Sequence, residues 1–332
     1  MKCSIKYVEK KIAVVGCKYT TRDFILGLES HGYRIDHCIT IVPKISKQQR
    51  ISGYYDLRNL LKSKSVPYTL VEKYNLRSEE DKKKLLDLKL DMILVIGWER
   101  LIPDWWLNSL NIGAFGMHGS SKPLPHGRGR SPLNWSLIQD KKIFFTHLTK
   151  YKPGIDDGDI VDFQIFDITK LDNCLTLHYK NLVSMIKLCV KNLPSLLDGT
   201  AKFIPQSNIG ESYYPKRSPK DGIIYWTDSS DDIYNLVRAV TKPYSGAFSY
   251  LCDDPDNKVF IWRAIPFDTH INFDSNPGEI TQVFYDGSFI VKTGDTSMLV
   301  LESEGYEFTE KDKGKWFGHL GKPRKIWENL PR

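Results

Sequence analysis

Residues 114–160 hold the side chains best suited to chemistry. His118 lies in Gly-Met-His-Gly-Ser, with a glycine close on either side. An imidazole can donate a hydrogen bond or carry a proton near neutral pH. Asp156 and Asp157 follow in the turn Pro-Gly-Ile-Asp-Asp-Gly-Asp-Ile, and a carboxylate beside an imidazole favours its cationic form. A lone histidine is more often structural than catalytic, so the fold must bring these groups together.

The chain before this segment alternates between strand and helix patterns, which predicts an α/β fold with a Rossmann-like parallel sheet covered by helices on both faces. Ligands of such sheets bind beyond the carboxyl ends of the strands, near the point where strand order reverses. The expected strands are 11–16, 35–42, 67–70 and 91–97, and the expected helices are 21–31 and 81–88.

Composition and missing motifs exclude several function classes. Gly16 is a single glycine after the first strand, where a dinucleotide fingerprint needs three, and no Walker pattern occurs. The six cysteines lack a Cys-x-x-Cys pair, which argues against a zinc ribbon and a disulfide scaffold and fits a reducing, cytoplasmic setting. Asp156, Asp157 and Asp159 are acidic enough to ligate an ion but are expected to form only a turn, so no metal site is expected. The charge of 47 − 40 = +7 is mild for 332 residues, so nucleic acid is not an expected partner. No apolar run approaches a membrane span.

The second half predicts a change of domain. Apolar residues at helical spacing predict a helix over 175–197, with Asp172 as its cap and a kink at Pro194. A polar stretch then separates an N-terminal catalytic domain, 1–206, from a C-terminal domain, 207–332. A helix at 230–239 precedes five short strands, which suggest a small, open, OB-like β-barrel. Those strands are expected at 249–251, 258–263, 280–285, 288–293 and 297–301.

Three motifs occur together in residues 114–160. They are Gly116-x-His118, then Arg-Gly-Arg-Ser-Pro-Leu-Asn-Trp at 128–135, then Asp-Asp-Gly-Asp-Ile at 156–160. In this combination the chain resembles the folate-dependent formyltransferases, whose signature is Asn-x-His, a loop with Arg-Gly, Pro-x-x-Trp and Asp-x-Gly-x-Ile. The resemblance covers roughly residues 10 to 250, and it looks more like the sugar N-formyltransferases than methionyl-tRNA formyltransferase.

The resemblance implies a catalytic pair, His118 and Asp156. A free amine attacks the formyl carbon of N10-formyltetrahydrofolate, and negative charge builds on the formyl oxygen. His118 would donate to that oxygen, while Asp156 would hold the imidazole and accept the amine proton. Asp157 is the alternative carboxylate.

The resemblance also implies two groups of binding residues. The folate would lie along residues 96–103, where Trp98 either stacks on the ligand or packs in the core. The cofactor-binding residues expected are Gly97, Trp98, Leu101, Ile102 and Asp157. The substrate-binding residues expected are Gly116, Met117, Ser120 and Arg128.

One position departs from the family pattern. Gly116 stands where the family has an asparagine, whose amide donates to the formyl oxygen. Losing such a donor typically costs about 10²–10³ in rate. A water molecule is the simplest expected replacement, a backbone N–H or another side chain are alternatives, and a substrate group could also fill the gap.

The sequence therefore predicts an N-formyltransferase that uses N10-formyltetrahydrofolate. Its expected substrate is an amino sugar, with a nucleotide-linked 4-amino-deoxy sugar as the preferred candidate. Methionyl-tRNA formylation is one alternative, and a non-catalytic binding homologue is another because of Gly116. No membrane partner is expected, and a homodimer stays open.

Overall fold

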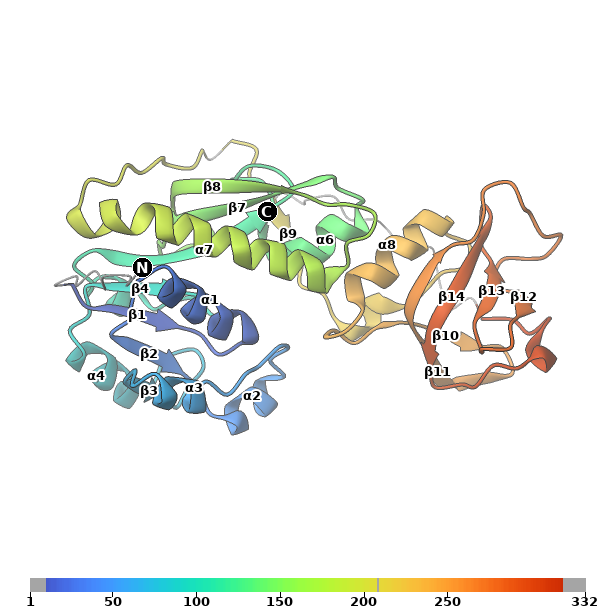
Figure 1. Ribbon diagram of the computed structural model, residues 1–332, viewed down its shortest axis with the longest axis horizontal. Helices are drawn as coiled ribbons and strands as arrows, with labels where there is room; N and C mark the ends of the chain where they lie inside the picture. The colour runs from blue at the N-terminus through green and yellow to red at the C-terminus, as the bar shows by residue number, and fades with distance from the viewer. Residues whose placement is uncertain (1–9, 208, 319–332) are drawn as a thin grey trace.

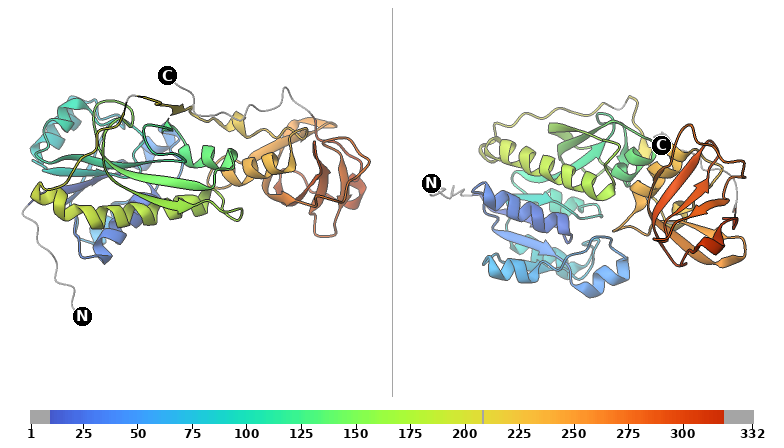
Figure 2. Two further views of the ribbon diagram at one scale, coloured as in Figure 1. Left: turned by 90° about the horizontal axis from the view of Figure 1, so that it is seen from above. Right: turned by 45° about the vertical axis from the view of Figure 1, so that its right-hand side comes forward.

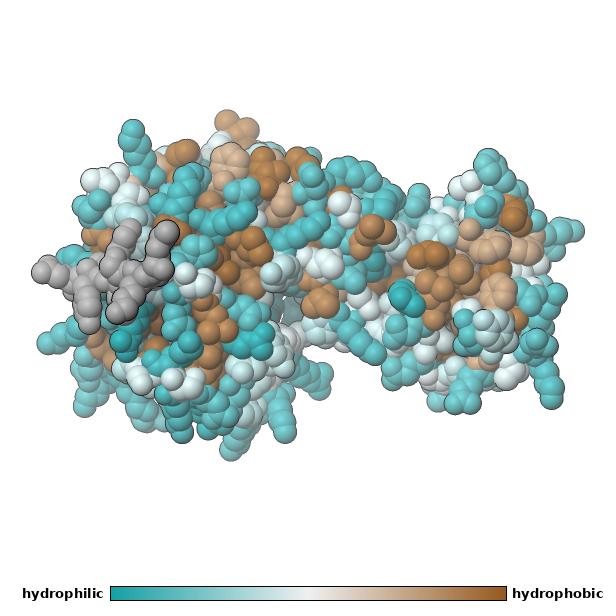
Figure 3. Space-filling model, in the orientation of Figure 1, coloured by the Kyte–Doolittle hydropathy of each residue, from teal (hydrophilic) through white to brown (hydrophobic). Residues whose placement is uncertain are grey.

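The chain forms a larger and a smaller lobe, with α8 (Ser230–Val240) lying between them (Figure 1). The computed structural model describes residues 10–207 and 209–318. Figure 3 shows the waist between the lobes from one side. Within those described ranges, no helix is long and apolar enough to cross a membrane.

The larger lobe is built on a seven-stranded sheet in the order β3-β2-β1-β4-β5-β7-β8. Its first five strands are parallel, while β7 and β8 run antiparallel to their neighbours. This confirms the predicted α/β class, and it places the reversal of strand order at the carboxyl ends of β1 and β4. The strands are β1 (Ile12–Val15), β2 (His37–Thr40), β3 (Tyr68–Leu70), β4 (Met92–Val95), β5 (Gly113–Ser120), β7 (Ile143–Lys150) and β8 (Asp159–Asp167).

Helices cover both faces of this sheet. One face packs against α1, α3 and α7 through residues such as Phe24, Leu61 and Leu182. The other packs against α4 and α5 through Leu85 and Trp106. Helices α1 and α7 lie side by side in the two views (Figures 1 and 2). The helices of this lobe are α1 (Tyr19–Ser30), α2 (Pro43–Gln49), α3 (Arg58–Ser63), α4 (Glu79–Asp87), α5 (Asp104–Leu107), α6 (Pro132–Ile138) and α7 (Cys174–Asp198).

The start of α7 differs from the prediction. Asn173, rather than Asp172, caps the helix, because its side chain accepts from the N–H groups of residues 175 and 176 at 2.9 and 3.1 Å. Asp172 instead accepts from the Thr169 N–H at 2.7 Å and pairs with Lys180 at 2.6 Å. The helix continues through Pro194 to residue 198 and ends at a glycine in the left-handed region.

The smaller lobe confirms the predicted five-stranded C-terminal unit. Its strands form an antiparallel sheet in the order β10-β11-β14-β13-β12. In the described part of the chain, the outer strands β10 and β12 are not paired with each other, so the sheet is open. The strands are β10 (Ala247–Leu251), β11 (Asp254–Pro266), β12 (Ile280–Val283), β13 (Phe289–Lys292) and β14 (Ser297–Glu304), with short 3₁₀ helices η1 (Pro219–Gly222) and η2 (Glu310–Asp312).

The chain between the lobes returns once to the larger lobe. A two-stranded ladder joins β6 (Arg128–Gly129) to β9 (Tyr213–Tyr214) in parallel. The ladder fixes the segment after Gln206 against the loop that follows β5. The domain boundary expected at residue 207 stays a prediction.

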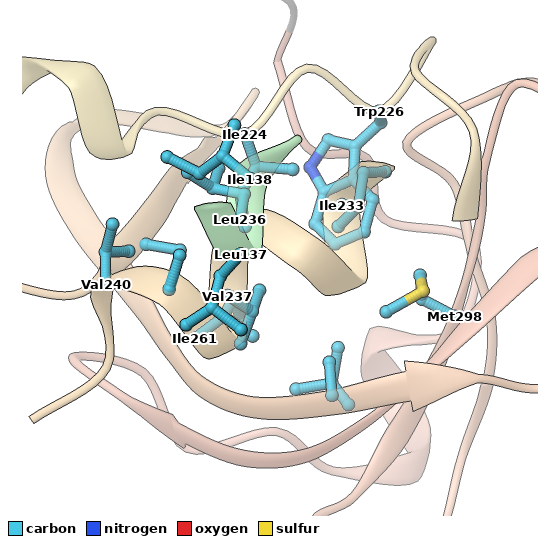
Figure 4. Packing of buried hydrophobic residues seen from close by; sticks show 14 of the residues in the cluster. Leu137, Ile138, Ile224, Trp226, Ile233, Leu236, Val237, Val240, Ile261 and Met298 are labelled. Carbon is cyan, nitrogen blue, oxygen red and sulfur yellow. The ribbon is translucent and has the colours of Figure 1, made fainter. Parts of the chain in front are cut away.

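A single apolar cluster connects the lobes (Figure 4). Leu137 and Ile138 of α6 pack with Leu236 and Val237 of α8, and the cluster continues into the C-terminal sheet. A hydrogen bond of 2.6 Å from the Asn134 side chain to the carbonyl of residue 239 adds a polar tie between α6 and α8. The smaller lobe is thereby fixed to the elements that follow the His118 strand.

Candidate active site

Strand β5 presents Gly116 and His118 on one face, because residues two apart in a strand point the same way. Its antiparallel neighbour β7 sets His147 opposite His118 and Thr149 opposite Gly116. Tyr151 comes directly after β7, and its N–H donates to the Ala114 carbonyl at 2.8 Å. The pairing therefore gathers two histidines, a glycine and a tyrosine on one face of two adjacent strands.

His118 lies between two hydrogen-bond acceptors. Its Nδ1 is 3.4 Å from Oδ2 of Asp156, and its Nε2 is 2.8 Å from the Gly127 carbonyl oxygen. A carbonyl oxygen only accepts, so the Nε2 contact requires a proton on Nε2, and the Nδ1 contact becomes an ion pair when Nδ1 is protonated as well. The two side chains are 11% and 27% exposed. The geometry suits a cationic donor that is shielded yet reachable.

The Asp156 turn is held from three sides. Asp156 has a φ of 51°, and its Oδ2 also accepts from the Gly129 N–H at 2.9 Å. The Gln206 amide donates to the carbonyls of Asp156 and Gly158 at 2.9 and 2.7 Å. Arg128 in turn donates to the Gln206 side-chain oxygen at 2.7 Å. These contacts stabilise a backbone conformation that a non-glycine residue rarely adopts.

His147 stays neutral beside His118. Burial, with the neighbouring His118 as a second cause, lowers the pKa of His147 to about 4. Its Nε2 accepts from the Leu124 N–H at 3.4 Å, which requires an unprotonated nitrogen. A neutral His147 avoids like-charge repulsion with a protonated His118.

Charged groups also meet at the reversal of strand order. Lys18 follows β1 and forms an ion pair with Glu99, which follows β4. Arg130 lies 3.9 Å from the same carboxylate. Burial would raise the pKa of Glu99, but the neighbouring Lys18 and Arg130 outweigh it and lower the pKa. Over the described residues, no cluster of three His, Cys, Asp or Glu side chains could hold a metal ion.

Comparison with known proteins shows what the chain is similar to. Residues 216–307 match the sequence family described as the formyl transferase C-terminal domain. The chain is also 37% identical over 198 residues to the bifunctional polymyxin resistance protein ArnA of Wigglesworthia glossinidia brevipalpis. The matched C-terminal part of the chain is therefore similar to formyl transferases. The match to ArnA covers 59% of this chain and 29% of ArnA, so the chain spans under a third of this relative.

Solved structures support the formyltransferase fold. HypX of Aquifex aeolicus in complex with tetrahydrofolic acid superposes with a TM-score of 0.64 at 15% identity, covering 88% of this chain and 44% of HypX. An N-formyltransferase of Helicobacter canadensis, in complex with folinic acid and dTDP-3-aminofucose, gives 0.60 at 16%, covering 89% and 100%. A 4-N formyltransferase of Francisella tularensis gives 0.55 at 18%, covering 72% and 91%.

Within this formyltransferase fold, the structure brings together Gly116, His118 and Asp156, but it gives three of the expected substrate residues other surroundings. Met117 points to the opposite face of β5 and packs towards the core under α1 and α7. Arg128 is 3% exposed and pairs with Glu211 at 2.9 Å as well as with Gln206. It therefore ties the β9 segment to the Asp156 turn instead of facing a ligand.

Ser120, also expected to bind substrate, is fully buried beneath the loop that follows β5. A side chain at Gly127 would lie 2.0 Å from the Ser120 hydroxyl, which shows how closely the loop packs on this serine. The same loop supplies the Gly127 carbonyl that accepts from His118. Ser120 thus positions the loop, and the expectation of direct substrate contact finds no support in this arrangement.

The expected folate residues divide into core and surface positions. Ile102 is 3% exposed and belongs to the core, whereas Leu101 is 56% exposed. Trp98 packs on Tyr74 with ring centroids 4.5 Å apart, which favours packing over stacking on a ligand. Gly97 has a φ of 73°, and a side chain there would meet Thr21 at 2.7 Å, so the close approach is to the start of α1.

Two buried polar atoms suit a pterin, the polar ring system of a folate. Within the described residues, Oδ1 of Asp157 and Nε1 of Trp98 are buried without a hydrogen-bond partner. Such atoms are rare in folded proteins, and a bound ligand is one way to satisfy them. A carboxylate oxygen accepts from amine groups and an indole N–H donates to a carbonyl, both of which a pterin carries. By its chemistry, each of these two atoms therefore fits a folate group.

Three side chains near the site were not anticipated from the sequence: Tyr151, Lys18 and Gln206. The fixed strand pairing places Tyr151 near Gly116, and the order β1-β4 places Lys18 beside Glu99. Only Lys18 had a local signal, because it follows a buried strand at its carboxyl end. Gln206 acts across 50 residues of sequence, so no local pattern indicates it.

Proposed function

We propose that this chain transfers the formyl group of N10-formyltetrahydrofolate to the amine of a nucleotide-linked amino sugar. The observation that carries the proposal is the contact between His118 and Asp156 at the end of β5. It supplies a hydrogen-bond donor and a proton acceptor at one place, as formyl transfer to an amine requires.

The chemistry assigned to each residue follows from its contacts. As the amine attacks the formyl carbon, the Nε2–H of protonated His118 turns from the Gly127 carbonyl to the oxygen on which negative charge develops. Asp156 stabilises that imidazolium and accepts the proton released by the amine, directly or through water. The Gly129 N–H donates to Oδ2 of Asp156 and so holds the carboxylate in position to accept that proton.

The nucleotide-linked amino sugar is supported by the relatives. The Helicobacter canadensis protein was crystallised with dTDP-3-aminofucose, and the Francisella tularensis protein is described as a 4-N formyltransferase. Both 3-amino and 4-amino sugars therefore belong in the test, with the 4-amino sugar retained as the first candidate. The donor is supported by the folates bound to HypX and to the Helicobacter canadensis protein.

A panel assay tests the proposal. The chain is incubated with N10-formyltetrahydrofolate and dTDP- or UDP-linked 3-amino and 4-amino sugars, and mass spectrometry follows the addition of one CO unit to the sugar. We expect formylation of at least one sugar, dependent on the folate. Formylation of methionyl-tRNA alone, or of no acceptor at all, would contradict the proposal, as would turnover without folate.

The variant His118→Ala should lower turnover at least about 10²-fold and leave folate binding largely intact, because the imidazole acts mainly on the transition state. His37→Ala is a matched control, since His37 lies on β2 and contacts Thr69 at 2.8 Å. Unchanged turnover in His118→Ala would remove the imidazole from the mechanism.

A further inference from the structure

The face of β5 that carries His118 has no side chain at Gly116, where formyltransferases have their amide donor. A Cβ built on Gly116 would point to the same face as His118. It would lie 2.2 Å from the Tyr151 hydroxyl oxygen and 2.5 Å from two carbons of the same ring. The space is therefore already filled, and the water expected there from the sequence is replaced by Tyr151.

The strand pairing explains why Tyr151 occupies this volume. Thr149 is the direct partner of Gly116, and Tyr151 lies two residues further along the same face. Diagonal neighbours of this kind are within reach of an aromatic side chain. Without a side chain on residue 116, the ring of Tyr151 can extend across to β5, so the glycine and the tyrosine form a complementary pair.

The Tyr151 hydroxyl can donate a hydrogen bond to a ligand. Within the described residues, the structure shows no hydrogen bond of this hydroxyl. Burial, with the nearby Asp156 carboxylate as a second cause, raises the pKa of Tyr151. The hydroxyl therefore remains protonated near neutral pH and keeps a proton to donate.

We propose that the Tyr151 hydroxyl replaces the missing amide and donates a hydrogen bond to the formyl oxygen of the donor. The assignment rests on the proposed formyl transfer. When the amine nitrogen bonds to the formyl carbon, the C=O π electrons move to the oxygen, which accepts from Tyr151 and His118. The amine proton passes to Asp156. The electrons on the oxygen then re-form C=O as the C–N10 bond breaks, and N10 takes up the proton held by Asp156. Tyr151 keeps its own proton throughout.

Tyr151→Phe tests the hydroxyl alone, because it keeps the ring that fills the space beside Gly116. We expect kcat to fall about 10²–10³-fold, as for loss of an oxyanion donor, with the KM of both substrates within about threefold of wild type. Tyr33→Phe is the control, since the Tyr33 hydroxyl contacts the Val190 carbonyl at 3.5 Å on the other face of the sheet.

The outcomes separate this assignment from the proposed function. An active wild-type chain whose Tyr151→Phe variant keeps kcat within about twofold would overturn the role of Tyr151 and leave formyl transfer standing. A wild-type chain that formylates none of the acceptors would overturn both.

A second pair of variants tests the shared volume without any assay of activity. Gly116→Asn should lower the thermal unfolding midpoint, because its Cβ meets Tyr151 at 2.2 Å. Adding Tyr151→Ala should recover part of that loss and restore the amide, so the double variant should be more active than Tyr151→Ala alone. The proposal that Tyr151 replaces the amide would be contradicted if Gly116→Asn were as stable as wild type. It would also be contradicted if the double variant had neither a higher activity than Tyr151→Ala nor a higher unfolding midpoint than Gly116→Asn.

Discussion

Replacing Asp156 with asparagine should lower kcat about 10²-fold while leaving the KM values nearly unchanged. With His118 protonated, as the proposed reaction requires, its Nδ1 lies 3.4 Å from Oδ2 of Asp156. At that distance their attraction is about 1 kcal/mol in bulk water and about 5 kcal/mol at an effective dielectric constant of about 20. Because the side chains are 11% and 27% exposed, an intermediate value of about 3 kcal/mol is appropriate, and it corresponds to about 10² in rate.

The substitution isolates the charge, because an asparagine oxygen can still accept from the Gly129 N–H. Steady-state kinetics with saturating folate and sugar give kcat, and Asp157→Asn serves as the matched control on the adjacent carboxylate. Asp157→Asn should instead raise the KM for folate, because the buried Oδ1 of Asp157 has no hydrogen-bond partner within the described residues and is expected to accept from the folate. A loss below about fivefold in Asp156→Asn, or an equal kcat loss in Asp157→Asn, would refute the assignment of the proton acceptor.

Three further predictions concern stability. Arg128→Met should reduce the free energy of unfolding in denaturant by about 2 kcal/mol, because it removes the buried hydrogen bonds of the guanidinium with Glu211 and Gln206. An unchanged free energy of unfolding would contradict this structural role and favour the expected role of Arg128 in binding substrate. Gly97→Ala should lower the free energy of unfolding by at least about 1 kcal/mol, because the residue has a φ of 73° and an added Cβ would lie 2.7 Å from the Thr21 hydroxyl. A variant as stable as wild type would show that the start of α1 can shift to make room for the methyl group. His147 has a pKa of about 4 when folded against 6.5 when unfolded, so the folded state binds fewer protons between these values and loses stability as the pH falls from about 6.5 to 4. His147→Phe should flatten that loss in unfolding experiments across this range, whereas an unaltered pH profile would assign the loss to other groups.

The larger features of the fold follow from sequence patterns because they repeat along the chain. Apolar runs separated by helical segments predict a parallel sheet, and the last of them, Asp91 to Gly97, contains β4. Short strands after a helix predict the smaller lobe, whose five strands are present. The apolar pattern of each segment indicates which of its faces is buried, and this pattern can be read without knowing the rest of the chain.

The details of the site depend on contacts between distant segments. Arg128 was expected to bind substrate, yet it reaches Glu211 and Gln206 across about 80 residues of sequence. Trp98 and Ile102 pack in the core, although the strand end that carries them was the expected folate pocket. A motif gives residue types and spacing, but the register of neighbouring strands and the return of β9 decide what each side chain contacts.

The same reasoning explains how a glycine can replace an amide beside a catalytic histidine. Two antiparallel strands offer one volume to side chains from either strand, so a polar group can reach it from residue 116 or from residue 151. When residue 116 is glycine, Tyr151 fills the volume, and when residue 116 carries an amide, a tyrosine at 151 would collide with it. The two positions are therefore coupled: each single change leaves either a clash or a gap, and only the paired change restores both packing and a donor. We expect the effects of Gly116→Asn and Tyr151→Ala on stability and on kcat to be strongly non-additive. The double variant should lose less of each than the two single variants lose together.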